Sequence, residues 1–143
     1  RLLAYAADGE SAIMALRVMA NLEGPWGPDL LYEVWTGTAS RTRSTETAEQ
    51  LLSTAALRSK ASPALKVALD LRQSASEDCL GRKDATQRAV EVGDTRSLQL
   101  IAKLARRYGC GPMGRLDCNA CLRDGDLVAR AMSAVRNRKG PDL

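Results

Sequence analysis

Apolar side chains recur along this chain at the spacing of three and four residues that marks one face of an α-helix. In residues 11–22, for example, Ile13, Leu16 and Met19 fall on one side. Similar patterns predict helices over residues 29–36, 45–57, 63–73, 77–92, 96–108 and 126–135, with shorter helical segments at 1–7 and 117–122. β-Branched residues are sparse and scattered, so no strand is predicted. We therefore expect an all-α protein.

Helix start and stop signals lie between these segments. Ser62 and Pro63 suit the N-cap and the first position of a helix. Gly37 and Gly93 each follow a predicted helix, where glycine is a common stop. Antiparallel helical hairpins are therefore expected. A recurring glycine–acid pair before several helices is typical of stacked HEAT-like hairpins, but its spacing is irregular, so an irregular bundle stays an open alternative.

Composition supports one helical domain over residues 1–143. Ala and Leu, the strongest helix formers, dominate, and Phe is absent. No apolar stretch approaches the length of about 18 residues that a membrane-spanning helix needs. The chain begins inside an apolar run, with no Met and no charged leader before it. We therefore expect a segment excised from a longer protein, without a signal peptide of its own.

Four cysteines stand out in the C-terminal half: Cys79, Cys110, Cys118 and Cys121. If residues 77–92 and 96–108 form an antiparallel hairpin, Cys79 and Cys110 lie at the same end of it. Cys118 and Cys121 follow after a short loop. All four sulfurs are therefore expected in one region, although they are widely spread along the chain.

Three interpretations of this cluster are open. The favoured one is two disulfides, with Cys79 joined to Cys118 or Cys121 and Cys110 joined to the other. The second is a structural zinc site that uses all four thiolates, and zinc is the only cofactor that the sequence suggests. The third is free thiols, with a redox pair at Cys118 and Cys121. Two disulfides predict a domain that works outside a reducing cytosol.

The segment of residues 108–123 (YGCGPMGRLDCNACLR) resembles a Cys-containing helical segment near the C-terminus of large myxobacterial-type multidomain proteins, including Ser/Thr-kinase-like receptors. The similarity extends loosely to residues 93–98 and 62–65. In such proteins the segment would lie beyond a membrane helix. The resemblance implies an extracytoplasmic accessory or sensor domain in signalling, periplasmic or at the cell surface. It transfers no catalytic residue to this chain.

The chemistry of the remaining residues argues against an enzyme. His is absent, which removes the commonest general base and the Ser-His and Cys-His nucleophile pairs. Kinase motifs are absent from the sequence as well. Carboxylates are scattered and suit solvated faces or helix caps. We therefore expect a non-enzymatic protein-interaction or sensor module with no catalytic residue and no bound metal.

Candidate contact residues come from two regions. Trp26 lies in a Gly-Pro loop and Trp35 in a predicted helix, and an exposed aromatic side chain would indicate a contact site. Arg106 and Arg107 belong to a basic group that could join a second group near Arg138 if the helices over 96–108 and 126–135 lie together. The alternative function is therefore a nucleic-acid or anionic-surface binder. Interleaved acids and few aromatics make nucleic acid the less favoured partner.

Overall fold

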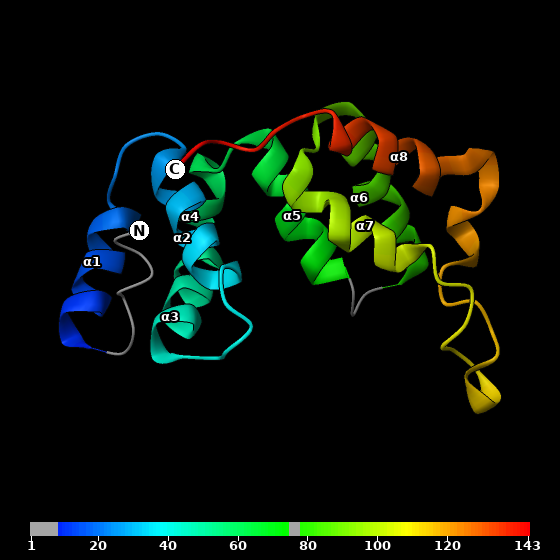
Figure 1. The fold of residues 1–143 in the computed structure, drawn as a ribbon, viewed down its shortest axis with the longest axis horizontal. Helices are drawn as coiled ribbons and strands as arrows, with labels where there is room; N and C mark the ends of the chain where they lie inside the picture. Colours follow the sequence, from blue (N-terminus) through cyan, green and yellow to red (C-terminus); the bar gives the residue numbers. More distant parts are fainter. Residues whose placement is uncertain (1–8, 75–77) are drawn as a thin grey trace. The chain divides into compact units, whose positions relative to one another are not determined.

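The computed structural model describes residues 9–74 and 78–143, and within these ranges the regular structure is helical (Figure 1). Its α-helices are α1 (Glu10–Ala20), α2 (Trp26–Thr36), α3 (Arg43–Leu52), α4 (Ala55–Lys60), α5 (Pro63–Gln73), α6 (Cys79–Val92), α7 (Leu98–Leu104) and α8 (Leu127–Arg136). Short 3₁₀ segments are η3 (Thr95–Ser97), η4 (Pro112–Gly114), η5 (Ala120–Leu122) and η6 (Asp124–Asp126). The predicted all-α class is confirmed. The helix expected at 1–7 lies outside the described residues.

The chain forms two compact units, Arg1–Ser62 and Pro63–Asp142, with Leu143 grouped with the first. The sequence pattern did not predict this division, and the single helical domain expected over 1–143 stays a prediction. In the first unit, α2 packs against α1, α3 and α4. Leu16, Leu31 and Leu52 supply fully buried side chains from α1, α2 and α3. Burial of these leucines is the main stabilising term that holds the three helices together.

Helix α2 begins earlier than predicted, at Trp26 rather than at residue 29. The earlier start places Gly27 in the first turn, where a Cβ atom would collide with the carbonyl oxygen of Met19 at the end of α1. Only glycine lets the first turn of α2 approach the last turn of α1 so closely. Gly27 and Pro28 are consequently buried.

The helix predicted over 45–57 is two helices. Helix α3 begins at Arg43 because Thr42 caps it, with its Oγ1 accepting from the amide of Thr45 at 3.2 Å. Helix α3 ends at Leu52, and Thr54 then caps α4 by accepting from the amide of Leu57 at 3.4 Å. The hydroxyl of Thr54 therefore marks the start of a second helix inside the pattern. The spacing of apolar residues alone did not indicate this start.

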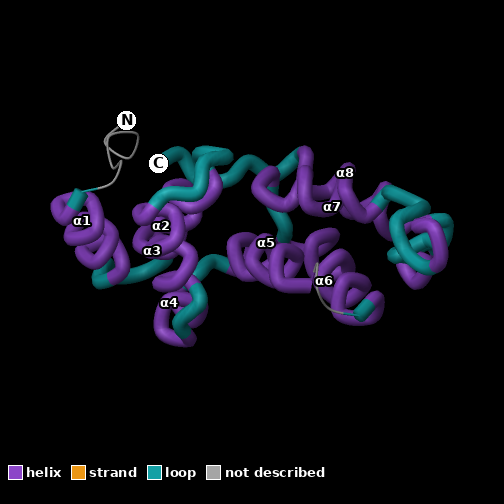
Figure 2. The backbone as a smooth tube through the Cα atoms, turned by 90° about the horizontal axis from the view of Figure 1, so that it is seen from below, coloured by secondary structure: helices purple, strands orange, loops and turns teal. Residues whose placement is uncertain are grey.

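The second unit contains two helix pairs, α5–α6 and α7–α8, arranged in two layers (Figure 2). Helices α6 and α7 each contact both α5 and α8. The small side chains of Ala85, Ala89 and Ala131 are completely buried where α6 and α8 meet. Their size lets the two helices approach closely. The remaining buried core residues are Val67, Leu71, Ile101, Leu122, Leu127, Val128 and Val135.

Helix α7 is shorter than the predicted 96–108, so Arg106 and Arg107 lie beyond its end rather than on a helix. Asp94 caps the preceding η3 by accepting from the amide of Arg96 at 3.0 Å. After α7, the carbonyl oxygen of Arg106 accepts from Arg123 Nη2 at 2.8 Å. The chain here is held by a side chain from another segment, which no local pattern could predict.

Two other boundaries are relevant to the site. The helix expected over 117–122 is reduced to η5 at Ala120–Leu122, whereas the one expected over 126–135 is present as α8. None of the helices in the described residues is long and apolar enough to cross a membrane. Because the helix expected over 117–122 is so short, the long connection between α7 and α8 has little regular structure. It contains three of the four cysteines.

Candidate interaction site at the disulfide-linked loop

Two disulfides join the four cysteines, Cys79 to Cys121 and Cys110 to Cys118. The Cα atoms are 6.0 Å apart in the first pair and 5.2 Å apart in the second. The predicted disulfides are confirmed, and of the two pairings that the sequence left open the structure has the one with Cys79 bonded to Cys121. No cysteine is free, so neither the zinc site nor the redox dithiol describes this structure.

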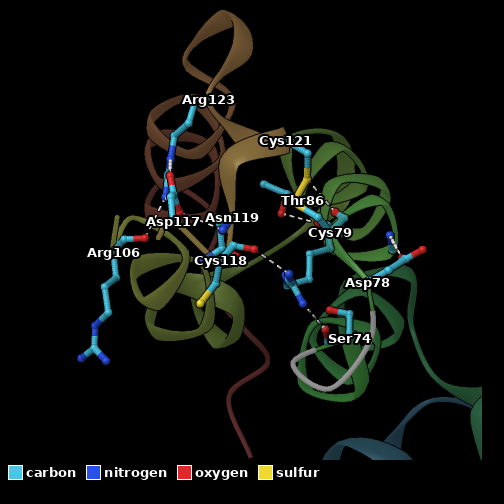
Figure 3. Close-up of a disulfide and its surroundings, with 12 residues drawn as sticks. Ser74, Asp78, Cys79, Thr86, Arg106, Asp117, Cys118, Asn119, Cys121 and Arg123 are labelled. Carbon is cyan, nitrogen blue, oxygen red and sulfur yellow. Dashed lines mark hydrogen bonds and ion pairs between the residues drawn. A yellow bond between two sulfur atoms is a disulfide. The ribbon is translucent and has the colours of Figure 1, made fainter. Parts of the chain in front are cut away.

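The Cys79–Cys121 disulfide joins the beginning of α6 to η5 (Figure 3). Asp78 caps α6 by accepting from the amide of Gly81 at 2.9 Å, which positions Cys79 in the first turn. Next to Cys121, Leu122 is buried in the core of the second unit. The segment that contains Cys121 is therefore attached to the helices both covalently and by apolar packing.

The Cys110–Cys118 disulfide closes a short loop, here called the Cys loop (residues 110–118). Inside it, Cys110 and Leu116 exchange backbone hydrogen bonds, with the Cys110 amide donating at 3.0 Å and the Leu116 amide at 2.8 Å. The amide of Gly114 donates to the carbonyl oxygen of Gly111 at 3.1 Å, which closes the turn. Disulfide and backbone bonds together leave the loop little conformational freedom.

The turn at the end of the Cys loop contains left-handed backbone. Gly111 has φ +68°, and Met113 has φ 58°, a conformation that a non-glycine residue seldom adopts. A Cβ atom on Gly111 would collide with the side chain of Leu116, which lies across the glycine. The surrounding structure therefore determines the turn, because Met113 by itself would prefer a right-handed or extended backbone.

The base of the loop is bonded to α6. Arg82 donates from Nη2 to the carbonyl oxygen of Cys118 at 2.8 Å and from Nη1 to that of Ser74 at 3.4 Å. One guanidinium thus connects the end of α5, α6 and the Cys loop. Figure 3 shows Ser74, Cys79 and Cys118 around this point.

A second arginine fixes the other side. Arg123 Nε lies 2.7 Å from Asp117 Oδ2, in an ion pair whose side chains are only 17% and 19% exposed. The hydrogen bond from Arg123, together with one from the Asn119 amide and the charges of Arg123 and Arg107, lowers the pKa of Asp117 to about 2. The same Arg123 bonds the carbonyl oxygen of Arg106 (Figure 3). Asp117 and Arg123 therefore hold together the part of the connection that leaves α7, at Arg106, and the part that leads toward α8.

The Cys loop exposes apolar side chains while its backbone is fixed. Met113 is 84% exposed and Leu116 58%, and Tyr108, just before the loop, is 61% exposed. The loop extends away from α7 and α8, and its yellow tip at η4 is far from both helices in Figure 1. A fixed backbone that exposes large apolar side chains is typical of contact surfaces rather than of structural loops.

Exposed basic side chains lie next to these apolar residues along the chain. Arg106, Arg107 and Arg115 are all exposed. The guanidinium carbon of Arg106 lies 5.2 Å from the ring centroid of Tyr108, a cation–π arrangement. We call these residues the loop surface: Tyr108, Met113, Leu116, Arg106, Arg107 and Arg115.

The structure separates the four predicted contact residues. Arg106 and Arg107 belong to the loop surface, whereas Trp26 and Trp35 belong to the first unit. Trp35 is partly buried and makes an edge-to-face contact with Tyr32, with ring centroids 6.0 Å apart, so it contributes to packing. Trp26 is 56% exposed at the start of α2 and remains a candidate contact residue.

The expected basic stripe along two helices is absent from the described structure, because its members have other positions and contacts. Arg138 donates to the carbonyl oxygens of Val90 at 2.9 Å and of Gly93 at 3.2 Å, and so caps the end of α6. Arg106 and Arg107 lie in the connection beyond α7. The two groups therefore have different roles, one structural and one at the surface.

Sequence reasoning missed the central residues of the site, Met113, Leu116 and Arg115. A signal was present, because Gly111-Pro112 and Gly114 on either side of Met113 are turn residues. That signal locates a turn but not the exposure of its side chains. Arg82 and Arg123 were also missed, since their carbonyl acceptors lie far away along the chain.

The described residues contain no group of three or more Cys, Asp or Glu side chains placed to hold a metal ion. Comparison with known proteins adds no family: no family model, curated protein or solved structure matches the chain. The geometry of the loop surface is therefore the basis for assigning a function to the chain.

Proposed function

We propose that this chain is a non-enzymatic protein-interaction module and that the loop surface is its contact site. The observation that carries the proposal is the combination of a backbone closed by a disulfide and hydrogen bonds with an apolar Met113 that is 84% exposed at its tip. A preformed loop loses little conformational entropy when a partner binds, so more of the contact energy appears as affinity.

The two disulfides support a place outside a reducing cytosol, at the cell surface or in the periplasm. This placement fits an accessory or sensor domain of the myxobacterial-type proteins that residues 108–123 resemble, which we include in the proposal. The thiols of protein isolated from its own cells provide the test. Four thiols protected from alkylation before reduction support the placement, and four thiols that react at once contradict it.

The helix pairs of the second unit support a HEAT-like description. Helices α5 and α6 form one pair and α7 and α8 the other, and the pairs pack through a common core. In such an arrangement, insertions between helices commonly form the binding face. The Cys loop lies in such an insertion, between α7 and α8.

A random peptide library displayed on phage tests the contact site. Peptides selected on the oxidised full chain are then measured against the double variant Met113→Ser/Leu116→Ser. The matched control is Met14→Ser/Val18→Ser, which removes two similarly exposed apolar side chains, 66% and 64%, from α1. We expect the selected peptides to lose binding to the loop variant and to keep it with the control. Equal binding to wild type and loop variant would contradict the proposed contact site.

A further inference from the structure

We infer that the partner of the loop surface is a protein with an acidic surface around an apolar recess that receives Met113. This inference rests on the proposed function and adds the chemistry of the partner. Its three supports are the charge along the connection, the ion pairs near the loop and the shape of the tip.

Positive charge is concentrated in the stretch that leads into and through the Cys loop. Residues 103–116 contain Lys103, Arg106, Arg107 and Arg115 and no acidic residue. The whole chain has a formal net charge of +4. The four basic residues of this stretch therefore equal the excess of basic over acidic residues in the whole chain. A partner surface of the same sign would be repelled, whereas an acidic surface is attracted and oriented.

The nearest acid does not neutralise this charge. Asp117 is engaged by Arg123 at 2.7 Å. Within residues 9–74 and 78–143, no ion pair involves Arg106 or Arg115, and Arg107 acts on Asp117 only through a longer-range charge interaction. The arginines of the loop surface are therefore available to carboxylates of another protein, with which they form bidentate hydrogen bonds.

The tip determines the apolar half of the recognition. Among the large apolar side chains of residues 9–74 and 78–143, Met113 is the most exposed. Pro112 and two glycines beside it leave it the only long apolar side chain of the turn. An unbranched thioether adapts its shape to a recess. Fully desolvated side chains at the centre of an interface, surrounded by polar contacts, carry most of the binding energy. Met113 would be the central apolar contact, and the exposed Arg115, two residues further along the chain, would belong to the polar surround.

A lipid bilayer fits the tip less well than a protein does. Even a myristoyl chain, with about 14 carbons, gives only marginal and reversible membrane binding. A single methionine buries far less apolar area than such a chain. The exposed arginines would add attraction to anionic lipids, but the apolar part would be too small to hold the loop in the bilayer.

The peptides selected on the oxidised chain also test the inference. We expect those that need Met113 to be rich in Asp and Glu around one or two large apolar residues. Synthetic versions with Gln for every Glu and Asn for every Asp separate charge from shape. Each lost charge contact at such a surface is expected to weaken binding by up to about fivefold. Replacing the central apolar residue of the peptide is expected to weaken it about tenfold.

Matched variants of the chain complete the design. Arg106→Gln/Arg107→Gln/Arg115→Gln removes the charge of the loop surface. Arg17→Gln/Arg136→Gln/Lys139→Gln removes the same formal charge from exposed positions elsewhere. The first variant is expected to weaken binding of the acidic peptides about 100-fold and the second to change it less than threefold. Vesicles of phosphatidylcholine with phosphatidylglycerol provide the lipid comparison.

The outcomes distinguish the inference from the proposed function. Loop-dependent peptides that bind equally well in their acidic and amide forms would overturn the acidic partner and leave the contact site standing. An equal loss in both charge variants would overturn it as well, because attraction would then be unspecific. Binding to vesicles that needs Met113, without acidic peptides being selected, would assign the tip to a bilayer instead. If no selected peptide depends on the loop surface, the proposed function itself is wrong.

Discussion

Both disulfides involve the connection between α7 and α8, and they have opposite surroundings. Cys79 and Cys121 are both partly buried, join segments 42 residues apart and adjoin the buried Leu122. Cys110 and Cys118 are 8 residues apart, and Cys110 is exposed, as is the nearby Met113. The first disulfide therefore attaches the connection to the core of the second unit. The second gives the attached segment a defined surface.

The largest expected effect comes from removing the first disulfide. Cys79→Ser/Cys121→Ser should lower the free energy of unfolding by about 4 kcal/mol, because the closed loop is long and its closure restricts the unfolded chain strongly. Denaturant unfolding followed by circular dichroism measures it. A loss no greater than that of the second disulfide would contradict the division of roles.

Removing the second disulfide should have a smaller effect on stability and a larger one on the loop. For Cys110→Ser/Cys118→Ser we expect a loss of about 2.5 kcal/mol, because the closed loop is short. Hydrogen exchange at the amides of Cys110 and Leu116, which are bonded across the loop, should become faster than in wild type. Unchanged exchange at Leu116 would show that the backbone bonds alone hold the loop.

A pair of glycine variants sharpens the argument about the tip. Gly111→Ala places a Cβ against Leu116 on a left-handed backbone, whereas Gly125→Ala has φ +63° and nothing within 4 Å of the new atom. Gly125 has left-handed helical backbone (ψ 27°), which costs alanine about 1 kcal/mol. Gly111 has ψ −170°, a region essentially confined to glycine, so Gly111→Ala should cost at least about 1 kcal/mol more, from the backbone and from the displaced Leu116 together. Thermal unfolding compares the two, and equal costs would contradict a tightly determined turn at Gly111.

The smallest expected effect is a dependence on acid. Because the pKa of Asp117 in the folded chain is lowered to about 2 from its ordinary 3.8, its charged form stabilises the folded chain. This contribution is complete above pH 3.8 and is lost as the pH falls toward 2. Asp117→Asn lacks it at every pH, so the difference in stability between wild type and variant should shrink across this window. A constant difference down to pH 2 would contradict the Asp117–Arg123 ion pair.

Much of the fold could be predicted because helix signals are local. Apolar spacing located most helices, and Pro63 marked the observed start of α5. The failures have the same origin. Thr54 starts a separate helix, and α7 ends at Leu104 where the chain turns toward the Cys loop. In both places the end of the helix depends on a cap or on a distant side chain rather than on the apolar pattern.

The sequence by itself determined the helical class and the approximate helix positions, because these follow from short-range spacing. It indicated the gathering of the four cysteines only through an assumed pairing of two helices. Only the tertiary structure decided that Cys79 pairs with Cys121, that Arg82 and Arg123 bond the connection to its neighbours, and that Met113 is exposed at the tip. Each of these depends on segments far apart along the chain meeting in space, and the free energy of such contacts is set by packing that no local pattern contains.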